Sequence, residues 1–206
     1  MTTTITVPSV AVIRRALTEF SLPAYDDQVL QIQQYIKMLL TWNEKINLTA
    51  IRDPLEMLYR HFCESMYAAE AIPMENGRLA DIGSGAGFPG LALKVVRPGL
   101  QVLLVESNIK KGAFLAEVIR ELRLSGAQVL ARRYEELGRR WPPSITFVRA
   151  RSVSSPVFSS GPGRNRLQQN KLFSGLVPAT SPKFTTFALG SGANRSPYLI
   201  PCGVCS

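Results

Sequence analysis

Asp81-Ile82-Gly83-Ser84-Gly85-Ala86-Gly87-Phe88-Pro89-Gly90 is the most informative part of this chain. It follows a short apolar run, Leu79-Ala80, and precedes the apolar segment 91–96, which we expect to be helical. Glycine lets the main chain take positive φ and lets a ligand approach without a Cβ in the way. The N–H groups at the start of the following helix can bind a polar ligand. A strand, a glycine-rich turn and a helix in this order predict a cofactor-binding loop.

A second acidic residue strengthens this interpretation. Glu106 lies 23 residues after Gly83 and ends the apolar run Val102-Leu103-Leu104-Val105. A carboxylate at the end of the next parallel strand can accept hydrogen bonds from the two hydroxyls of a ribose. The two motifs together predict a cofactor that contains adenosine.

The choice between two such cofactors depends on Asp81. Residues 85–90 match G-x-G-x-x-G, so a nicotinamide-dependent oxidoreductase is an alternative. Residues 81–87 also match D-x-G-x-G-x-G, the spacing of methyltransferase loops. A carboxylate at Asp81 would attract the cationic amino group of a methionine moiety and repel a pyrophosphate. We therefore favour S-adenosylmethionine, bound by Asp81, Gly83, Gly85 and Glu106; a glycine-rich turn without a ligand is the remaining alternative.

The composition sets broad limits. At 206 residues and 46% hydrophobic residues, the chain fits one domain with a small helical extension. No apolar run approaches 18 residues, and the first 17 residues lack the features of a signal peptide. Three cysteines, two of them in the pair Cys202 and Cys205, suggest neither a disulfide framework nor a zinc site. We expect a cytoplasmic monomer without a metal.

The net charge of +9 is unevenly distributed. Residues 1–136 contain 15 acidic residues and 15 Lys or Arg, so this part of the chain is neutral. All nine remaining basic residues follow Glu136. The basic excess therefore does not by itself predict binding to RNA.

The order of elements predicts the fold class. Helical periodicity predicts three N-terminal helices. The first covers 10–20 and the third begins at Pro54. The second could be capped by Asp26 or Asp27, and its apolar face includes Leu30 and Tyr35. Strands at 79–82, 102–105, 129–131 and 145–148 then alternate with helices at 90–96 and 109–124. This alternation predicts an α/β fold, a Rossmann-like methyltransferase sheet of parallel strands with an N-terminal helical cap. We place the cap at 1–70, the methyltransferase core at 71–151 and an irregular tail at 152–206.

The tail differs from the rest of the chain. Residues 152–206 hold ten Ser, six Pro, six Gly and no Asp or Glu. A native disordered tail is one explanation. A shifted reading frame explains the loss of acidic residues better, and the C-terminal part of the sheet would then be incomplete. Sequencing of the 3′ end of the gene tests this, because an uninterrupted frame through Ser206 would reject it.

Beyond the glycine loop, the chain resembles the bacterial small-subunit ribosomal RNA methyltransferase G family, also called glucose-inhibited division protein B. The matching stretches within residues 20–152 are Trp42-Asn43-Glu44-Lys45-Ile46-Asn47-Leu48-Thr49-Ala50, Arg60-His61-Phe62, Glu64-Ser65, residues 81–90, Arg97-Pro98, Glu106-Ser107, Lys110-Lys111, Phe114-Leu115, residues 133–136 and Ala150-Arg151-Ser152. Glu64 stands where the family usually has aspartate. After Arg151 the strands and helices that complete the family's sheet are not recognisable.

The resemblance implies N7 methylation of a guanine in 16S rRNA by S-adenosylmethionine, with the small ribosomal subunit or its RNA as partner. It assigns cofactor contacts to Gly83, Phe88, Tyr134, Glu135 and Arg151. Guanine N7 carries a lone pair and no proton, so no general base is required and we name no catalytic residue. Positioning and exclusion of water suffice, with the base splayed or flipped out.

The sequence is also compatible with other interpretations. A small-molecule methyltransferase and a non-enzymatic RNA-binding module are alternatives, although the latter would not need Asp81 and Glu106. His61, the only histidine, fits a hydrogen-bonded structural role better than catalysis. Trp42 is either a core anchor or a stacking platform for a base. Lys110-Lys111 either contacts phosphate or begins a solvated helix.

Overall fold

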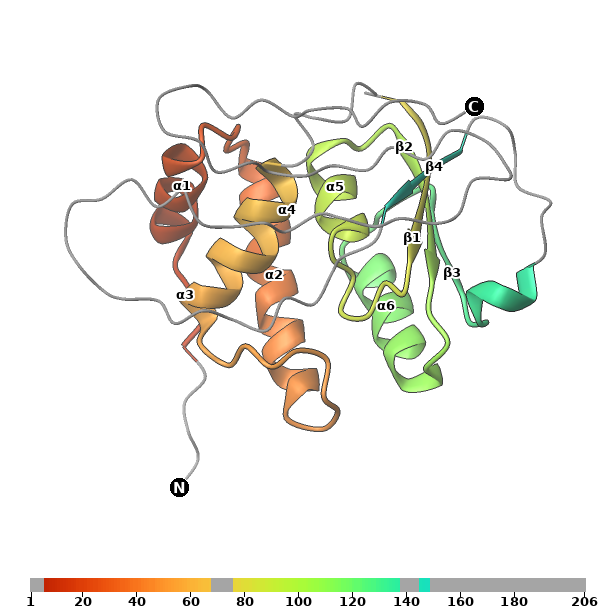
Figure 1. Ribbon diagram of the computed structural model, residues 1–206. Coiled ribbons are helices and arrows are strands. Elements are labelled where there is room, and N and C mark those ends of the chain that lie inside the picture. Colours follow the sequence, from red (N-terminus) through yellow and green to blue (C-terminus); the bar gives the residue numbers. More distant parts are fainter. Residues whose placement is uncertain (1–5, 68–75, 138–144, 149–206) are drawn as a thin grey trace, which may run out of the picture.

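The computed structural model describes residues 6–67, 76–137 and 145–148 (Figure 1). The N-terminal helices are α1 (Val10–Glu19), α2 (Asp26–Asn43), α3 (Pro54–Met57), the π-helical turn η1 (Leu58–Cys63) and α4 (Glu64–Tyr67). The following elements are β1 (Gly77–Ile82), α5 (Gly90–Val96), β2 (Leu100–Val105), α6 (Ile109–Glu121), β3 (Ala127–Leu130), the 3₁₀ turn η3 (Tyr134–Leu137) and β4 (Ile145–Val148). The described elements thus follow the predicted order.

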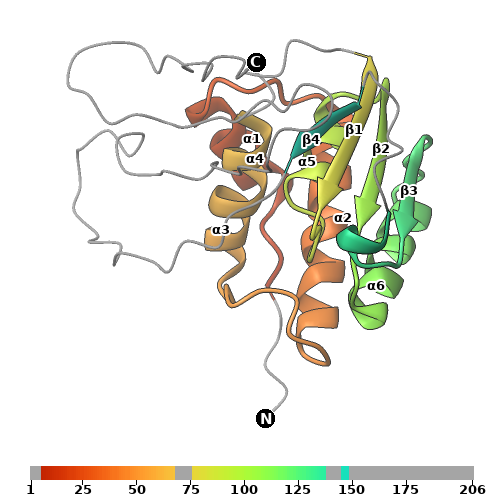
Figure 2. The ribbon, with the colours of Figure 1, turned by 45° about the vertical axis from the view of Figure 1, so that its right-hand side comes forward.

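The sheet has the order β3-β2-β1-β4, and all three pairs of neighbouring strands are parallel. Asp81 of β1 lies beside Leu104 of β2, so the carboxyl ends of the two strands meet at one edge. Figures 1 and 2 show α5 and α6 between the sheet and the N-terminal helices. The predicted Rossmann-like α/β fold with an N-terminal helical cap is confirmed.

The main core lies between this face of the sheet and the helices. Fully buried side chains from every layer meet there, among them Tyr35 and Ile36 of α2, Phe62 of η1, Leu91 of α5 and Phe114 of α6. Burial of one such side chain stabilises the fold by about 1.5–3 kcal/mol. On the opposite face a smaller cluster of Ala80, Ile82, Val105, Ile145 and Phe147 packs with Tyr134 and Leu137. The core therefore joins the cap and the sheet into one packed unit.

Two expectations for α2 are wrong. Neither Asp26 nor Asp27 caps the helix, because the N-cap residue is Tyr25 and no side chain bonds the first turn. Both carboxylates lie inside the first turn, where they interact favourably with the helix dipole, and Asp26 pairs with Arg14. Leu30 is 54% exposed and is not part of the core cluster.

The helix expected from Pro54 is interrupted. It begins with Asp53, whose side chain accepts a hydrogen bond from the N–H of Glu56 at 2.7 Å, and with Pro54 in its first turn. The π-helical turn η1 then separates α3 from α4. Such turns change which face the following residues present and are frequent at functional sites. This one carries His61 and Phe62 toward the glycine loop.

Several predictions fall outside the described residues. These are the Arg151 contact, the irregular tail 152–206 with its shifted frame, the pair Cys202 and Cys205, and the domain boundaries after residues 70 and 151. Within the described ranges, no helix is both long and apolar enough to cross a membrane. The same residues contain no cluster of three His, Cys, Asp or Glu side chains suited to a metal.

Candidate functional site

The glycine loop leaves the carboxyl end of β1 and is fastened to β2. The N–H groups of Gly83 and Ser84 both donate to the Val105 carbonyl, at 2.8 and 3.1 Å. The Gly87 N–H closes the turn on the Ser84 carbonyl at 2.7 Å. The loop and Glu106 therefore meet at the edge of the sheet where the sequence placed them.

Glu106 connects the glycine loop to the start of α6. Only 7% of the residue is exposed. Oε2 accepts the Gly85 N–H at 2.8 Å, and Oε1 accepts the Asn108 N–H at 2.8 Å. Each carboxylate oxygen has a second lone pair, so hydroxyl donors can still bind it. The carboxylate predicted to hold a ribose thus also shapes the loop.

Asp81 lies beneath the loop and is fully buried. Oδ2 accepts the Gly90 N–H at 2.9 Å, whereas Oδ1 is buried with no hydrogen-bond partner within the described ranges. Burial, opposed by the Gly90 hydrogen bond and reinforced by the charge of Glu106, raises the pKa of this carboxyl to about 7. A cation near Oδ1 would favour the charged carboxylate. Asp81 is therefore a buried acid whose protonation state depends on its neighbours.

The four glycines of the loop have different surroundings. A Cβ at Gly83 (φ +71°) would meet nothing within 4 Å, and one at Gly85 (φ +57°) would meet only the Gly83 carbonyl oxygen, at 3.8 Å. A Cβ at Gly87 would overlap the Tyr35 hydroxyl. One at Gly90 would lie 2.7 Å from Asp81 Oδ2 and 2.8 Å from Leu104 Cδ2. The first two glycines border open space and the last two are packed.

Phe88, predicted to contact the cofactor, is packed among other aromatic rings. Only 7% of the residue is exposed. The rings of His61 and Tyr35 stack with it, with centroids 4.7 and 5.4 Å away, and Phe62 meets it edge to face at 4.9 Å. Little of Phe88 therefore remains available to a ligand.

Tyr35 is a site residue that the sequence reasoning treated only as part of an apolar helix face. Its hydroxyl donates to the Ala86 carbonyl at 2.7 Å and so ties the glycine loop to α2. Burial, followed by the charge of Asp81, raises its pKa well above the usual value. The only signal in the sequence is the residue type, because a buried tyrosine usually has a partner for its hydroxyl.

The remaining predicted residues are more dispersed. Tyr134 and Glu135 follow the carboxyl end of β3 in η3, where Tyr134 is half-buried and Glu135 is exposed. Trp42 packs edge to face with Phe114 at 5.7 Å, as expected of a core anchor. The first turn of α6 is capped by Asn108, whose Oδ1 accepts from the N–H groups of Lys110 and Lys111, and Lys110 is exposed.

A groove elsewhere on the molecule has a volume of about 640 Å³. It lies between α2, the N-terminal segment and the end of α6, with Leu30, Lys37 and Arg123 in its wall. None of the predicted site residues lines it.

A model of the GidB family, rRNA small subunit methyltransferase G, matches residues 28–170. Proteins named Ribosomal RNA small subunit methyltransferase G are similar in sequence. The protein from Xylella fastidiosa is 49% identical over 53% of this chain and 50% of its own. The Chloroflexus aggregans protein is 45% identical over 59% of this chain and 51% of its own, and that from Dichelobacter nodosus is 38% identical over 69% and 66%.

The chain spans about half the length of the first two of these relatives. Among solved structures, a precorrin-6y C5,15-methyltransferase from Geobacter metallireducens aligns at 10% identity with a TM-score of 0.37, over 49% of this chain and 50% of that one. This similarity is too weak to add to the fold described above.

Proposed function

Because the chain belongs to the rRNA small subunit methyltransferase G family, we propose that it transfers a methyl group from S-adenosylmethionine to the N7 atom of a guanine in 16S rRNA. The observation that carries the proposal is the open half of the glycine loop, Gly83 and Gly85, bordered by Glu106. We further propose that it acts in the cytoplasm, as a monomer, on the RNA of the small ribosomal subunit.

The residues around the loop fit this cofactor. Gly83 and Gly85 leave space in which a ligand can reach the main chain. Glu106 retains lone pairs for ribose hydroxyls, and the buried Oδ1 of Asp81 lacks a partner among the described residues. A cationic amino group near Asp81 would stabilise its charged carboxylate, whereas a pyrophosphate would be repelled by it. This charge preference supports S-adenosylmethionine over a nicotinamide dinucleotide.

The chemistry requires little from the protein beyond binding and orientation. When bound, S-adenosylmethionine supplies an electrophilic methyl group on a positively charged sulfur. Guanine N7 offers a lone pair and carries no proton, so the transfer needs no base. The protein's contribution is to fix the two reactants in line and to keep water out. The only histidine suits this scheme, because burial, followed by the charge of Arg60, lowers its pKa to about 4 and leaves the ring neutral.

Methyl transfer to defined RNA tests the proposal directly. The full chain is incubated with S-adenosylmethionine carrying a labelled methyl group and with either naked 16S rRNA or small subunits from cells lacking the enzyme. We expect label in one guanine, located by chain cleavage at N7-methylguanine. Gly85→Asp is the matched control, since its bulk and charge fill the open half of the loop. Tight binding of NADH without binding of S-adenosylmethionine would reject the methyltransferase in favour of an oxidoreductase.

A further inference from the structure

Three aromatic rings from three parts of the chain are stacked around the glycine loop. His61 of η1 and Tyr35 of α2 lie almost parallel to Phe88 of the loop, with interplanar angles of 11° and 14°. Stacked rings separated by 4.5–7 Å attract one another beyond the effect of burial alone. Phe88 is therefore positioned by rings of the N-terminal cap, with His61 and Tyr35 stacked on it and Phe62 edge to face.

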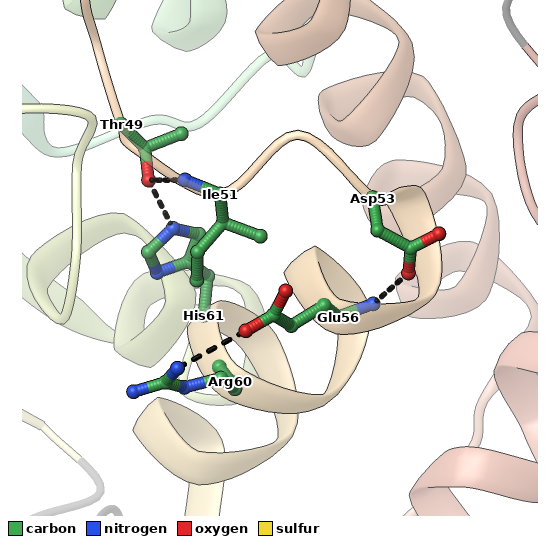
Figure 3. Close-up of polar contacts among 6 residues, drawn as sticks. All are labelled: Thr49, Ile51, Asp53, Glu56, Arg60 and His61. Atoms are coloured by element: carbon green, nitrogen blue, oxygen red, sulfur yellow. Dashed lines mark hydrogen bonds and ion pairs between the residues drawn. The ribbon is translucent and has the colours of Figure 1, made fainter. Parts of the chain in front are cut away.

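Each of the two outer rings is fixed by a hydrogen bond. The Tyr35 hydroxyl donates to the Ala86 carbonyl at 2.7 Å, within the loop itself. The His61 Nε2 atom lies 2.8 Å from the Thr49 hydroxyl oxygen (Figure 3). That oxygen accepts the Ile51 N–H at 3.2 Å, which leaves the hydroxyl hydrogen free to be donated to Nε2. Thr49 thus sets the orientation of the imidazole.

Thr49 is in turn held by Asn43, at the end of α2. Asn43 is 3% exposed, and its Nδ2 donates to the Thr49 carbonyl at 3.0 Å. Its Oδ1 accepts the N–H groups of Leu48 and Thr49, at 2.9 and 3.1 Å. The buried Asn43 amide therefore holds the segment after α2 in place, and this fixes the position of the Thr49 hydroxyl.

These contacts join three stretches that are far apart in the sequence. Asn43 orders Thr49, Thr49 orients His61, and His61 stacks with Phe88. We propose that Thr49 and His61 are positioning residues, which act through Phe88 to hold the glycine loop in the shape that receives the cofactor. The proposal rests on the proposed function in one respect only, namely the identity of that cofactor.

Thr49 offers a closely matched pair of variants. Thr49→Val keeps the size and branching of the side chain but removes the hydroxyl, whereas Thr49→Ser keeps the hydroxyl. Thr49→Val removes both hydrogen bonds of the hydroxyl, the one with His61 Nε2 and the one from the Ile51 N–H. If the binding shape of the loop loses the equivalent of one such bond, affinity falls about five- to tenfold. We expect Thr49→Val to raise the dissociation constant for S-adenosylmethionine by about that factor, and Thr49→Ser to stay close to the wild-type value.

The second measurement needs no cofactor. Hydrogen exchange of the loop amides 85–87 is followed in the full-length, ligand-free chain, with amides in β1 and β2 as internal reference. We expect faster exchange in the loop of Thr49→Val and unchanged exchange in the strands. His61→Phe, which keeps a ring beside Phe88 but offers no acceptor to Thr49, should give a smaller change in the same direction.

The outcomes distinguish a failure of the positioning role from a failure of the proposed function. If Thr49→Val lowers the melting temperature while loop exchange and affinity stay as in Thr49→Ser, Thr49 is merely structural and the inference is overturned. If the wild-type chain does not bind S-adenosylmethionine, the proposed function fails, and the exchange measurement still decides whether Thr49 and His61 position the loop.

Discussion

The two halves of the glycine loop contrast in what surrounds them. Around Gly83 and Gly85 there is room for a side chain. Around Gly87 and Gly90 there is none, because Tyr35, Asp81 and Leu104 occupy the space. One run of sequence therefore combines glycines that face a prospective ligand with glycines that permit close packing of the cap and the sheet.

This contrast shows that a glycine motif is not one functional unit. The packed half belongs to the core, and its replacement affects folding. The open half contributes little to packing, and its replacement affects what the loop can bind. Two glycine substitutions test this separation directly. Two further substitutions change the carboxylates that contact the two halves, Asp81 at Gly90 and Glu106 at Gly85.

The largest effect on stability is expected for Gly87→Ala. The new Cβ would overlap the Tyr35 hydroxyl and approach Leu91 and Leu115 at 2.9 and 3.1 Å, at a residue whose φ is +90°. Overpacking and unfavourable φ together should cost about 3–5 kcal/mol in the free energy of unfolding, enough to unfold many domains. Urea unfolding followed by circular dichroism measures it. Stability close to wild type would mean that this half is not packed as described.

Gly85→Ala should affect binding much more than stability. The added methyl group meets only the Gly83 carbonyl oxygen, so the cost is that of a left-handed φ, about 1–2 kcal/mol. Affinity for S-adenosylmethionine should fall by about a hundredfold, or 2.7 kcal/mol, because the Cβ enters the space of the ligand. Calorimetric titration of the folded variant measures the loss. An unchanged affinity would place the cofactor elsewhere.

Asp81→Asn should alter how stability depends on pH. The pKa of Asp81 is raised to about 7 in the folded chain, chiefly by burial. Between pH 4 and 7 the folded state keeps a proton that the unfolded state releases, so wild-type stability falls as the pH rises. Asparagine does not titrate, and its side-chain oxygen can still accept the Gly90 N–H. From pH 5 to pH 7, the free energy of unfolding of the variant should therefore rise by about 2 kcal/mol relative to that of the wild type.

The difference between the two proteins isolates this effect. The lowered pKa of His61 acts with the opposite sign, since the unfolded state binds a proton below about pH 6.5 and the folded state does not. It is common to both proteins and cancels in the comparison. Denaturant melts at pH 5, 6 and 7 provide the measurement, and parallel curves would show that Asp81 is already charged in the folded chain.

Glu106→Gln is expected to have the smallest effect of the four. The glutamine amide cannot accept at both ends, so either Gly85 N–H or Asn108 N–H loses its acceptor. Affinity for S-adenosylmethionine should fall by about tenfold. An analogue of the cofactor without ribose hydroxyls separates the two roles of Glu106. If the variant binds this analogue as well as wild type does, Glu106 serves the ribose alone and does not shape the loop.

Much of the fold was predictable because it depends on local patterns. Alternating apolar runs placed all four described strands, and parallel geometry then placed Glu106 beside the glycine loop. The capping of α2 and the exposure of Leu30 were predicted wrongly, since each depends on which neighbours pack against the helix. The role of the Tyr35 hydroxyl could not be predicted for the same reason, because its acceptor lies 51 residues away in the chain.

The spacing of the glycines does not predict which of them are packed and which border open space. Gly85 and Gly87 are two residues apart and both have positive φ, yet one borders open space and the other lies against Tyr35. The π-helical turn η1, which brings His61 to Phe88, also has no recognisable pattern in the sequence. Both features arise only when the cap and the sheet come together.

The most direct test follows the backbone amides of the uniformly ¹⁵N-labelled chain by NMR during titration with S-adenosylmethionine. The largest shifts should occur at Gly83, Ser84, Gly85 and Glu106, with smaller ones at Gly87 and Gly90. No shifts on addition of the cofactor, or shifts confined to the groove beside Leu30 and Arg123, would contradict a cofactor site on the open half of the loop.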